Sequence, residues 1–129
     1  MKDVNKVILV GRLGADPVLR STQNGGSFSH FPMATSRKWK SEKDAEEQTL
    51  QEETQWHNII AWGRQGENCA QYLKKGQRVY VEGMIRMRKY ESKEGQSKTA
   101  FEVHADSVSF LDGKRPAVRS QPETEVLVN

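Results

Sequence analysis

The sequence predicts an all-β protein, a small Greek-key barrel of five strands with one short helix between the third and fourth strands. Five segments alternate apolar and polar residues with the period of a strand, and turn signals separate them. Only residues 64–76 have the apolar spacing of a helix. The 129 residues suffice for one domain with its own hydrophobic core.

The first two strands are expected at residues 4–13 and 27–39. The sequence NGG at residues 24–26 is a strong hairpin-turn signal just before the second of them. Pro32 lies inside that second strand and lacks the N–H that a sheet ladder needs, which predicts an edge position or a bulge. The charged residues 40–51 that follow predict a long loop.

The remaining elements are expected as a strand at residues 54–62, the helix at 64–76, and strands at 77–90 and 99–111. In the helix, Cys69, Tyr72 and Leu73 form one apolar stripe, and Gly76 is expected to cap its C-terminal end. A mostly antiparallel five-stranded sheet with its helix in this place is the plan of the oligonucleotide-binding (OB) fold. Residues 1–111 are therefore predicted to form the domain, and the polar residues 112–129 a short C-terminal tail outside it.

Several classes of protein are disfavoured. Cys69 is the only cysteine, so no internal disulfide can form, and no apolar run approaches the roughly 20 residues of a membrane span. We therefore expect a soluble cytoplasmic protein with no membrane association. The three histidines lack metal-ligand spacing and no glycine-rich phosphate loop is present, so the sequence predicts neither an enzyme nor a cofactor or metal site.

The charge is unevenly distributed. Residues 42–53 contain six acids and one base, and residues 112–129 contain three of each. The rest of the chain holds sixteen bases against eight acids. A basic body indicates an anionic partner, with nucleic acid as the first candidate; a solvated basic surface without a partner is the alternative.

The strand at residues 54–62 carries large rings on one face. Trp56 and Trp62 share that face, because strand side chains alternate with a period of two. His57, Ile59 and Ala61 lie on the other face and have the character of a core. Two further groups combine rings with cations, namely Arg37, Lys38, Trp39 and Lys40, and Arg86, Arg88, Lys89 and Tyr90. Exposed rings stack on unpaired bases and cations neutralise phosphates, so this pattern favours binding of single-stranded nucleic acid over packing of the rings or simple solubility.

The chain resembles the bacterial single-stranded DNA-binding protein family. The matching motifs run in family order over most of residues 1–111: NKVILVGRLGADP, NGG, ATS, TQWHNIIAWGR, YLKKG, VYVEGMIRMRKY and GQSKTAFEVHAD. The resemblance implies an OB fold, a homotetramer, and tight, sequence-tolerant binding of single-stranded DNA in replication, recombination and repair.

The resemblance also implies roles for individual residues. Trp39, Trp56, Trp62 and Tyr90 match the stacking rings of the family, with Tyr90 where many members have Trp and Trp62 where many have Phe. His57 matches a histidine of the subunit interface. The matching backbone-contacting bases are Arg64, Lys75, Arg86, Arg88 and Lys89, with Lys6, Arg12 and Arg20 as weaker matches.

Two features depart from the family. The acidic run at residues 42–53 adds negative charge beside the Trp39 hairpin, which would weaken binding or make it more salt-sensitive unless the run extends clear of the groove. The sequence QPETEVLVN at the C-terminal end lacks the acidic Pro-Phe tip through which members recruit repair enzymes, so that recruitment is not expected. A chromosomal protein of the nucleoid and a phage- or plasmid-borne version both stay open. Other open functions are an RNA-binding or primosome-assembly module and an oligomeric interaction protein with its rings in subunit interfaces.

Overall fold

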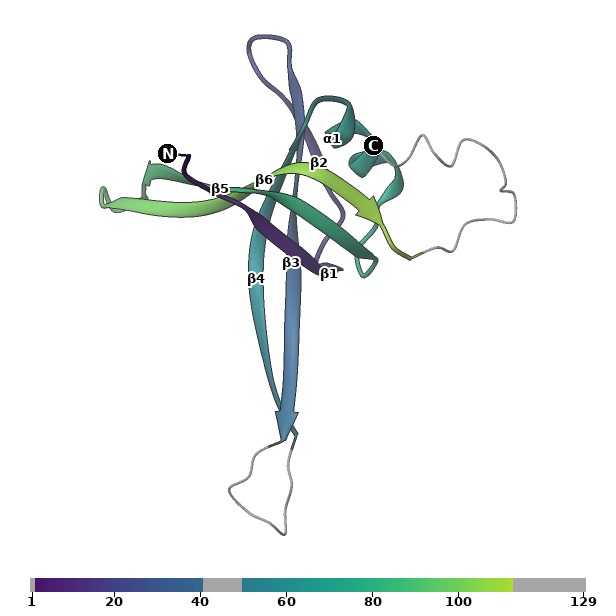
Figure 1. Ribbon diagram of the computed structural model, residues 1–129. Coiled ribbons are helices and arrows are strands. Elements are labelled where there is room, and N and C mark those ends of the chain that lie inside the picture. The colour runs from purple at the N-terminus through teal and green to yellow at the C-terminus, as the bar shows by residue number, and fades with distance from the viewer. Residues whose placement is uncertain (1, 41–49, 113–129) are drawn as a thin grey trace, which may run out of the picture.

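The computed structural model describes residues 2–40 and 50–112. Its elements are β1 (Val7–Leu13), β2 (Val18–Ser21), β3 (Ser27–Lys40), β4 (Leu50–Trp62), α1 (Gly63–Tyr72), β5 (Arg78–Glu91) and β6 (Ser97–Phe110). Two long hairpins, β3–β4 and β5–β6, extend in different directions from a small body that holds β1 and α1 (Figure 1).

Five of the strands close into a barrel. The sheet order is β1-β5-β6-β4-β3-β2, and a further pairing of β1 with β3 completes the circle. All neighbours are antiparallel except β4 and β6, which pair in parallel through Ile59↔Val103 and Ile60↔His104. The predicted OB barrel is confirmed. As expected, α1 lies between β4 and β5, which are the third and fourth barrel strands in chain order.

One strand was not expected. β2 pairs with β3 from Val18↔His30 to Ser21↔Ser27, so it lies beside the barrel and does not belong to the closed circle. The turn at residues 24–26 is confirmed, because Gly25 has a φ of 90° and its N–H donates to the Thr22 carbonyl. β2 has only four residues, all exposed, and thus shows no alternation by which its sequence could predict a strand.

The core fills the barrel and the space beneath α1. Phe31, Met33, Ile59, Val79 and Val81 are fully buried, and Leu13, Cys69, Leu73, Val103 and Val108 join them. These residues come from the inward faces of β1, β3, β4, β5 and β6 and from α1 and the residue after it. In β3, β4 and β5 the buried residues follow the period-two pattern that the sequence predicts, whereas in β6 a register shift between Ala105 and Ser107 places both Val103 and Val108 in the core.

Pro32 lies where β3 changes neighbours on one edge. β2 pairs with β3 up to His30, and β1 pairs with it from Met33 onward. The Pro32 carbonyl accepts the Gly14 N–H on that edge. Because the N and O of one strand residue point to the same edge, the missing N–H faces this change of partner. β3 itself is not an edge strand, since it pairs with β4 on one side and with β2 and β1 on the other.

The helix ends earlier than expected. α1 stops at Tyr72, and its C-terminal capping residue is Leu73, whose N–H donates to the Cys69 carbonyl. Lys74 therefore lies outside the helix, and its N–H donates to the Gln77 side chain. Gly76 does not cap the helix: it has a φ of 90°, and its N–H donates to the Leu13 carbonyl in the turn that leads into β5.

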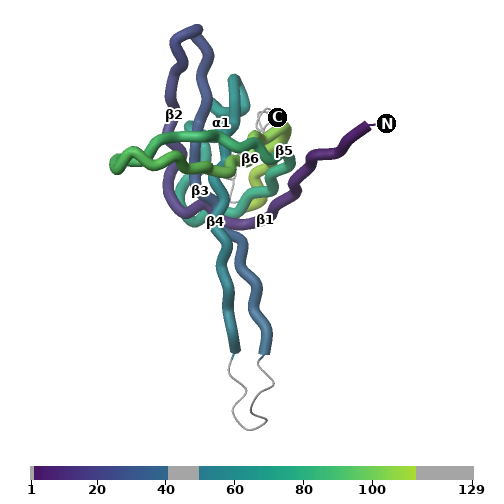
Figure 2. The backbone as a smooth tube through the Cα atoms, turned by 90° about the vertical axis from the view of Figure 1, so that its left-hand side faces the viewer, coloured from purple at the N-terminus to yellow at the C-terminus, as the bar shows by residue number. Residues whose placement is uncertain are grey.

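The predicted loop at residues 40–51 is shorter than expected. Lys40 ends β3, and Leu50 and Gln51 begin β4, so the two strands pair from Phe28↔Trp62 to Lys40↔Leu50. They form an arm that projects well beyond the barrel (Figures 1 and 2). Residues 41–49, which contain most of the acidic run, lie outside the described residues.

Candidate nucleic-acid interface

The two tryptophans of β4 lie on the outer surface of the barrel. The exposed fraction is 63% for Trp56 and 46% for Trp62, whereas Ile59 and Ala61 on the opposite face are fully buried. The predicted division of the strand into a ring face and a core face is therefore confirmed. Ile60 is the exception, since it lies on the ring face but is 6% exposed.

The parallel pairing of β4 with β6 extends this ring face across two more strands. Ile60 is the register partner of His104, and His104 is the register partner of Met84 in β5. Directly paired residues share a face of a sheet. Arg86, which pairs with Glu102, therefore continues the same surface. By alternation so do Arg88 and Tyr90, so Trp56 and Trp62 of β4 share one outer face with Arg86, Arg88 and Tyr90 of β5.

Trp62 lies at the junction of three strands. Its ring centroid is 4.8 Å from that of Phe28, its register partner in β3, with the two planes at 42°. On the other side its Nε1–H donates to His104 Nδ1 at 3.1 Å. Arg20 of β2 pairs with Phe28, so this weaker candidate cation lies on the ring face too.

A carboxylate joins this junction to the β5 cations. Glu102 accepts a hydrogen bond from Arg88 Nε at 2.8 Å, and its other oxygen lies 3.2 Å from His104 Nε2. Burial of Glu102 works to raise its pKa, but the hydrogen bonds from Arg88 and His104 outweigh it and hold the pKa below its ordinary value. The Arg88 guanidinium also lies 5.7 Å from the centre of the Tyr90 ring.

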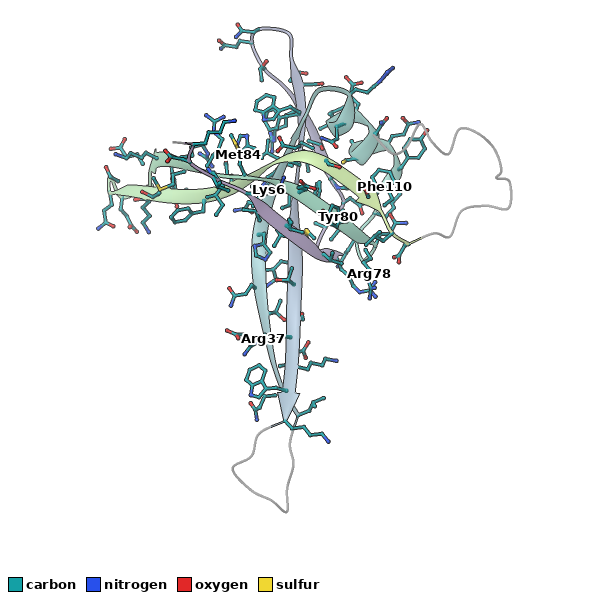
Figure 3. The ribbon with its side chains drawn as sticks, in the orientation of Figure 1. Lys6, Arg37, Arg78, Tyr80, Met84 and Phe110 are labelled. Carbon is teal, nitrogen blue, oxygen red and sulfur yellow. The ribbon has the colours of Figure 1, made fainter. Side chains whose placement is uncertain are left out.

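Trp39 lies on the other side of the arm. Trp56 pairs with Ala34, and Trp39 is an odd number of residues from Ala34, so the two rings occupy opposite faces of the β3–β4 ladder. Arg37 shares the Trp39 face, with its guanidinium 4.9 Å from the ring centre and an ion pair to Glu53 at 3.9 Å. Figure 3 shows Arg37 on the projecting arm, away from the barrel body.

Part of the acidic run belongs to this arm. Glu53 pairs with Arg37 on the Trp39 face, and Glu52 is the register partner of Lys38 on the ring face. Lys40 continues the ring face at the end of β3. Each described carboxylate of the run thus stands directly opposite a cation, which reduces the repulsion that the sequence predicts.

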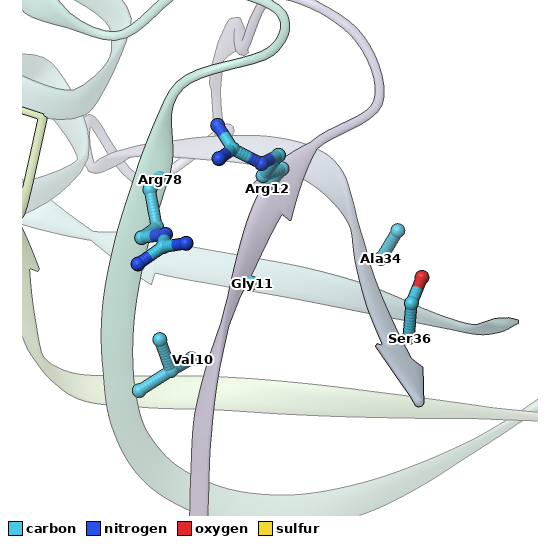
Figure 4. Close-up of a pocket in the computed structure, with 6 residues that line it drawn as sticks. All are labelled: Val10, Gly11, Arg12, Ala34, Ser36 and Arg78. Atoms are coloured by element: carbon cyan, nitrogen blue, oxygen red, sulfur yellow. The ribbon is translucent and has the colours of Figure 1, made fainter. Parts of the chain in front are cut away.

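A hollow next to the base of the arm holds two arginines. It has a volume of about 310 Å³, and its walls come from three strands, with Val10, Gly11 and Arg12 of β1, Ala34 and Ser36 of β3, and Arg78 of β5. Arg12 and Arg78 are register partners and lie side by side, with Ala34 and Ser36 across from them (Figure 4). Arg12 donates to the Gly76 carbonyl at 3.0 Å. Ala34 pairs with Trp56, so the hollow continues the ring face.

Arg78 was missed by the sequence interpretation. Its position could have been found from alternation, because it precedes Tyr80, Glu82, Met84 and Arg86 on the outward face of β5. It follows the turn directly, however, and no ring stands beside it in the sequence.

The other predicted cations are spread more widely. Lys6 forms an ion pair with Glu82 on the outer face of β5, and this contact raises the pKa of Lys6 and lowers that of Glu82. Arg64 lies in the first turn of α1, just after Trp62, and Lys75 in the turn after the helix. Among residues 2–40 and 50–112, neither Arg86 nor Lys89 has a carboxylate within 4.0 Å.

His57 lies on the inward side of the arm, not on the ring face. Its Nε2 is 2.9 Å from Thr35 Oγ1, and burial lowers the pKa of the imidazole. In the part of the chain that the structure describes, no three His, Cys, Asp or Glu residues are grouped so that they could hold a metal ion. None of the described helices has the length and apolarity needed to cross a membrane.

Comparison with known proteins agrees with this geometry. The chain is 42% identical to single-stranded DNA-binding proteins of Neisseria meningitidis over 122 residues, which is 95% of this chain and 68% of theirs. It is 41% identical to single-stranded DNA-binding protein 1 of Chlorobaculum tepidum over 114 residues, 88% of this chain and 68% of that protein.

A solved structure also matches. The Plasmodium falciparum single-stranded DNA-binding protein, in complex with single-stranded DNA, aligns with a TM-score of 0.74 and 31% identity over 87% of this chain and 98% of that one. Residues 4–111 match the model of the single-strand binding protein family, and the chain belongs to that family.

Proposed function

We propose that this protein binds single-stranded DNA without sequence preference and protects it during replication, recombination and repair. It does so by stacking exposed rings on unpaired bases while cations neutralise phosphates. The family is one of non-catalytic DNA-binding proteins, and the protein is not an enzyme. The binding function follows from membership of the family and from the DNA-bound Plasmodium relative.

One observation carries the proposed mechanism. The hydrogen bond from Trp62 Nε1 to His104 Nδ1 joins the ring-bearing face of β4 to the cation-bearing face of β5 and β6. A strand of nucleic acid that crosses this junction meets a ring and then cations within one continuous surface. The paired bases of duplex DNA are not accessible to these rings, so the surface favours single strands.

Residue roles follow from position and exposure. Trp56, Trp62 and Tyr90 are proposed as stacking platforms on the ring face, and Trp39 as a platform on the other face of the arm. The proposed phosphate contacts are Arg12, Arg20, Arg37, Lys38, Lys40, Arg64, Lys75, Arg86, Arg88, Lys89 and, most weakly, Lys6. Arg78 is added to these because it lies beside Arg12 in the hollow.

We further propose that the protein acts as an oligomer, with a homotetramer as the family expectation and His57 at a subunit interface. A single barrel offers few stacking sites, and a strand that contacts several subunits gains effective concentration. Ile8 and Val10 support this proposal, because they are 57% and 49% exposed on the outer side of β1. Sedimentation analysis of the purified protein tests it.

Residues 1–111 are proposed as the binding domain and residues 112–129 as a tail. The family match at 4–111 and the end of β6 at Phe110 support that boundary. Residues 113–129, and with them the proposed lack of a partner-recruiting tip, lie outside the described residues. A cytoplasmic location is likewise proposed from the family.

Titration with an oligo-dT strand tests the proposed function. Stacking on the tryptophans should quench their fluorescence strongly, and added salt should weaken the effect. Duplex DNA of equal length should quench far less. Trp56→Ala and Trp62→Ala should each reduce the quenching and the affinity.

A ribo-oligomer of matched length separates the DNA function from an RNA function. Tighter binding of the ribo-oligomer would replace the proposed substrate by RNA. Unchanged fluorescence with every oligomer would contradict the proposal. It would favour the alternative in which the rings lie in subunit interfaces.

A further inference from the structure

Trp62 and Arg88 are connected by a chain of three hydrogen bonds. Trp62 Nε1–H donates to His104 Nδ1 at 3.1 Å, His104 Nε2 lies 3.2 Å from Glu102 Oε1, and Arg88 Nε donates to Glu102 Oε2 at 2.8 Å. The four residues come from β4, β6 and β5, and we call them the Trp62–Arg88 relay. Glu102 and His104 lie two residues apart on one face of β6, between the ring and the guanidinium.

The hydrogen bonds fix the tautomer of the His104 imidazole. An indole N–H can only donate, so His104 Nδ1 must be the unprotonated acceptor. The remaining ring nitrogen, Nε2, then carries the proton and donates to Glu102. The His104 side chain is therefore held in one tautomer by the two groups on either side of it.

The side chains at the centre are more buried than those at the ends. The side chains of Glu102 and His104 are 13% and 16% exposed, whereas that of Arg88 is 58% exposed and the residue Trp62 is 46% exposed. The inner pair is thus shielded from solvent, and the outer pair presents a ring face and a cation to it. Such an arrangement orients exposed groups by means of buried ones, in the way that supporting residues orient groups of a functional site.

We propose that His104 and Glu102 are positioning residues for nucleic-acid binding, which hold the Trp62 ring and the Arg88 guanidinium in one fixed arrangement. The inference rests on the proposed function, because it assigns a purpose to the spacing between a stacking ring and a phosphate-binding cation. A free indole and a free guanidinium would each lose rotamer freedom on binding, and the relay removes part of that cost in advance.

A double-mutant cycle tests the ring end of the relay. His104→Leu should weaken oligo-dT binding about fivefold, the size of one lost hydrogen bond. Trp62→Phe keeps an aromatic face but has no N–H to donate. In that background His104→Leu should change the affinity less than about twofold, because the bond is already absent.

Two further variants separate positioning from packing. His104→Gln can still accept with one atom and donate with another, so it should bind within about twofold of the unchanged protein. Met84→Leu alters the register partner of His104 without removing a hydrogen bond and should leave the affinity unchanged. Equal effects of His104→Leu in both backgrounds, or no effect in a folded protein, would overturn the proposal.

The carboxylate end has a test in which simple electrostatics predicts the opposite sign. Glu102→Gln removes a negative charge from a surface that faces a polyanion, which by charge alone strengthens binding. The relay predicts binding at least about threefold weaker, because Arg88 and His104 lose the ion that holds them. Glu91→Gln, at the end of β5, is the matched control and should not weaken binding. Stronger binding by Glu102→Gln would count against the relay.

A measurement without DNA distinguishes failure of the relay from failure of the proposed function. The Trp62 indole N–H should exchange with solvent more slowly than those of Trp39 and Trp56, and His104→Leu should remove the difference. Equal exchange at all three indoles would reject the relay whatever the protein binds. Lack of oligo-dT binding together with slow exchange at Trp62 would reject the proposed function and keep the relay as a device for another ligand.

Discussion

Gly11 of β1 lies directly against the backbone of Ala34 in β3. A Cβ atom on residue 11 would lie 2.1 Å from the Ala34 carbonyl oxygen and 3.2 Å from Thr35 Cγ2. The contact lies where β1 pairs with β3, and this pairing closes the barrel. The register partners there are Arg12↔Ala34 and Leu13↔Met33. Only a residue without a side chain allows the two strands to approach this closely.

Gly11→Ala should therefore destabilise the barrel. The clash is with backbone, which cannot rotate aside, so we expect a loss of about 1–3 kcal/mol in the free energy of unfolding, as for overpacked cores. Urea denaturation followed by circular dichroism measures it. Gly26→Ala is the control, because its nearest contact is the Thr22 hydroxyl at 3.3 Å; a change there as large as at Gly11 would contradict the argument.

The opposite faces of the arm lead to a prediction about additivity. Trp39→Ala and Trp56→Ala should each weaken oligo-dT binding by about 1–3 kcal/mol, the usual contribution of one stacked base. The two rings lie on different faces of the β3–β4 ladder and share no partner. Their effects should add within about 0.5 kcal/mol, as for independent sites. A double variant that binds no more weakly than Trp56→Ala would show that Trp39 makes no contact.

Cations with and without a carboxylate partner should differ in the salt dependence of binding. Arg86 has no described carboxylate within 4.0 Å, whereas Lys6 forms an ion pair with Glu82. Each phosphate contact adds roughly 0.7 to the slope of log affinity against log salt for single strands. Arg86→Ala should lower the slope by about that amount and Lys6→Ala by clearly less. Titrations at four salt concentrations measure both slopes, and a larger effect at Lys6 would reverse the ranking.

The stability of the fold should depend on pH through His57. Burial lowers the pKa of His57 in the folded protein, so below the ordinary value of 6.5 the unfolded chain binds the proton more readily. The contribution of neutral His57 is fully present above pH 6.5 and is lost as the pH falls below it. His57→Gln should show a shallower loss of unfolding free energy between pH 6.5 and 5.5, at a fixed protein concentration. Parallel curves for the two proteins would exclude this role.

The thiol of Cys69 should be inert in the folded protein. Cys69 is fully buried in the core, and burial raises the pKa of its thiol to about 12. Because the thiolate is the reactive form, a thiol reagent at pH 8 should label the native protein very slowly. Labelling in 8 M urea should be complete and fast. Rapid labelling without urea would show that the helix α1 opens readily.

The sequence allowed the faces of the individual strands to be predicted, because alternation is a local property. Trp56 and Trp62 could be separated from Ile59 and Ala61 by position alone, and the structure confirms that separation. The turn at Gly25 was equally local, since this residue has a positive φ that glycine adopts without strain.

The joining of those faces could not be predicted, because it depends on register. Nothing in residues 54–62 indicates that Ile60 pairs in parallel with His104, which is more than 40 residues away in the chain. The same limit applies to Trp39, whose face relative to Trp56 follows only from the pairing of Ala34 with Trp56. The relay was missed for this reason too: His104 and Trp62 become neighbours only when the barrel closes.

The parallel seam between β4 and β6 has a consequence for when the protein can bind. Before β4 and β6 pair, Trp56 and Trp62 belong to the hairpin β3–β4, whereas Arg86, Arg88 and Tyr90 belong to the hairpin β5–β6. A nucleic acid would then have to order both hairpins as it binds, which costs conformational entropy. In the closed barrel the hairpins are already ordered by folding. Binding capacity should therefore arrive all at once, with the last long-range pairing, and a newly made chain should pass from inactive to fully competent without a weakly binding intermediate.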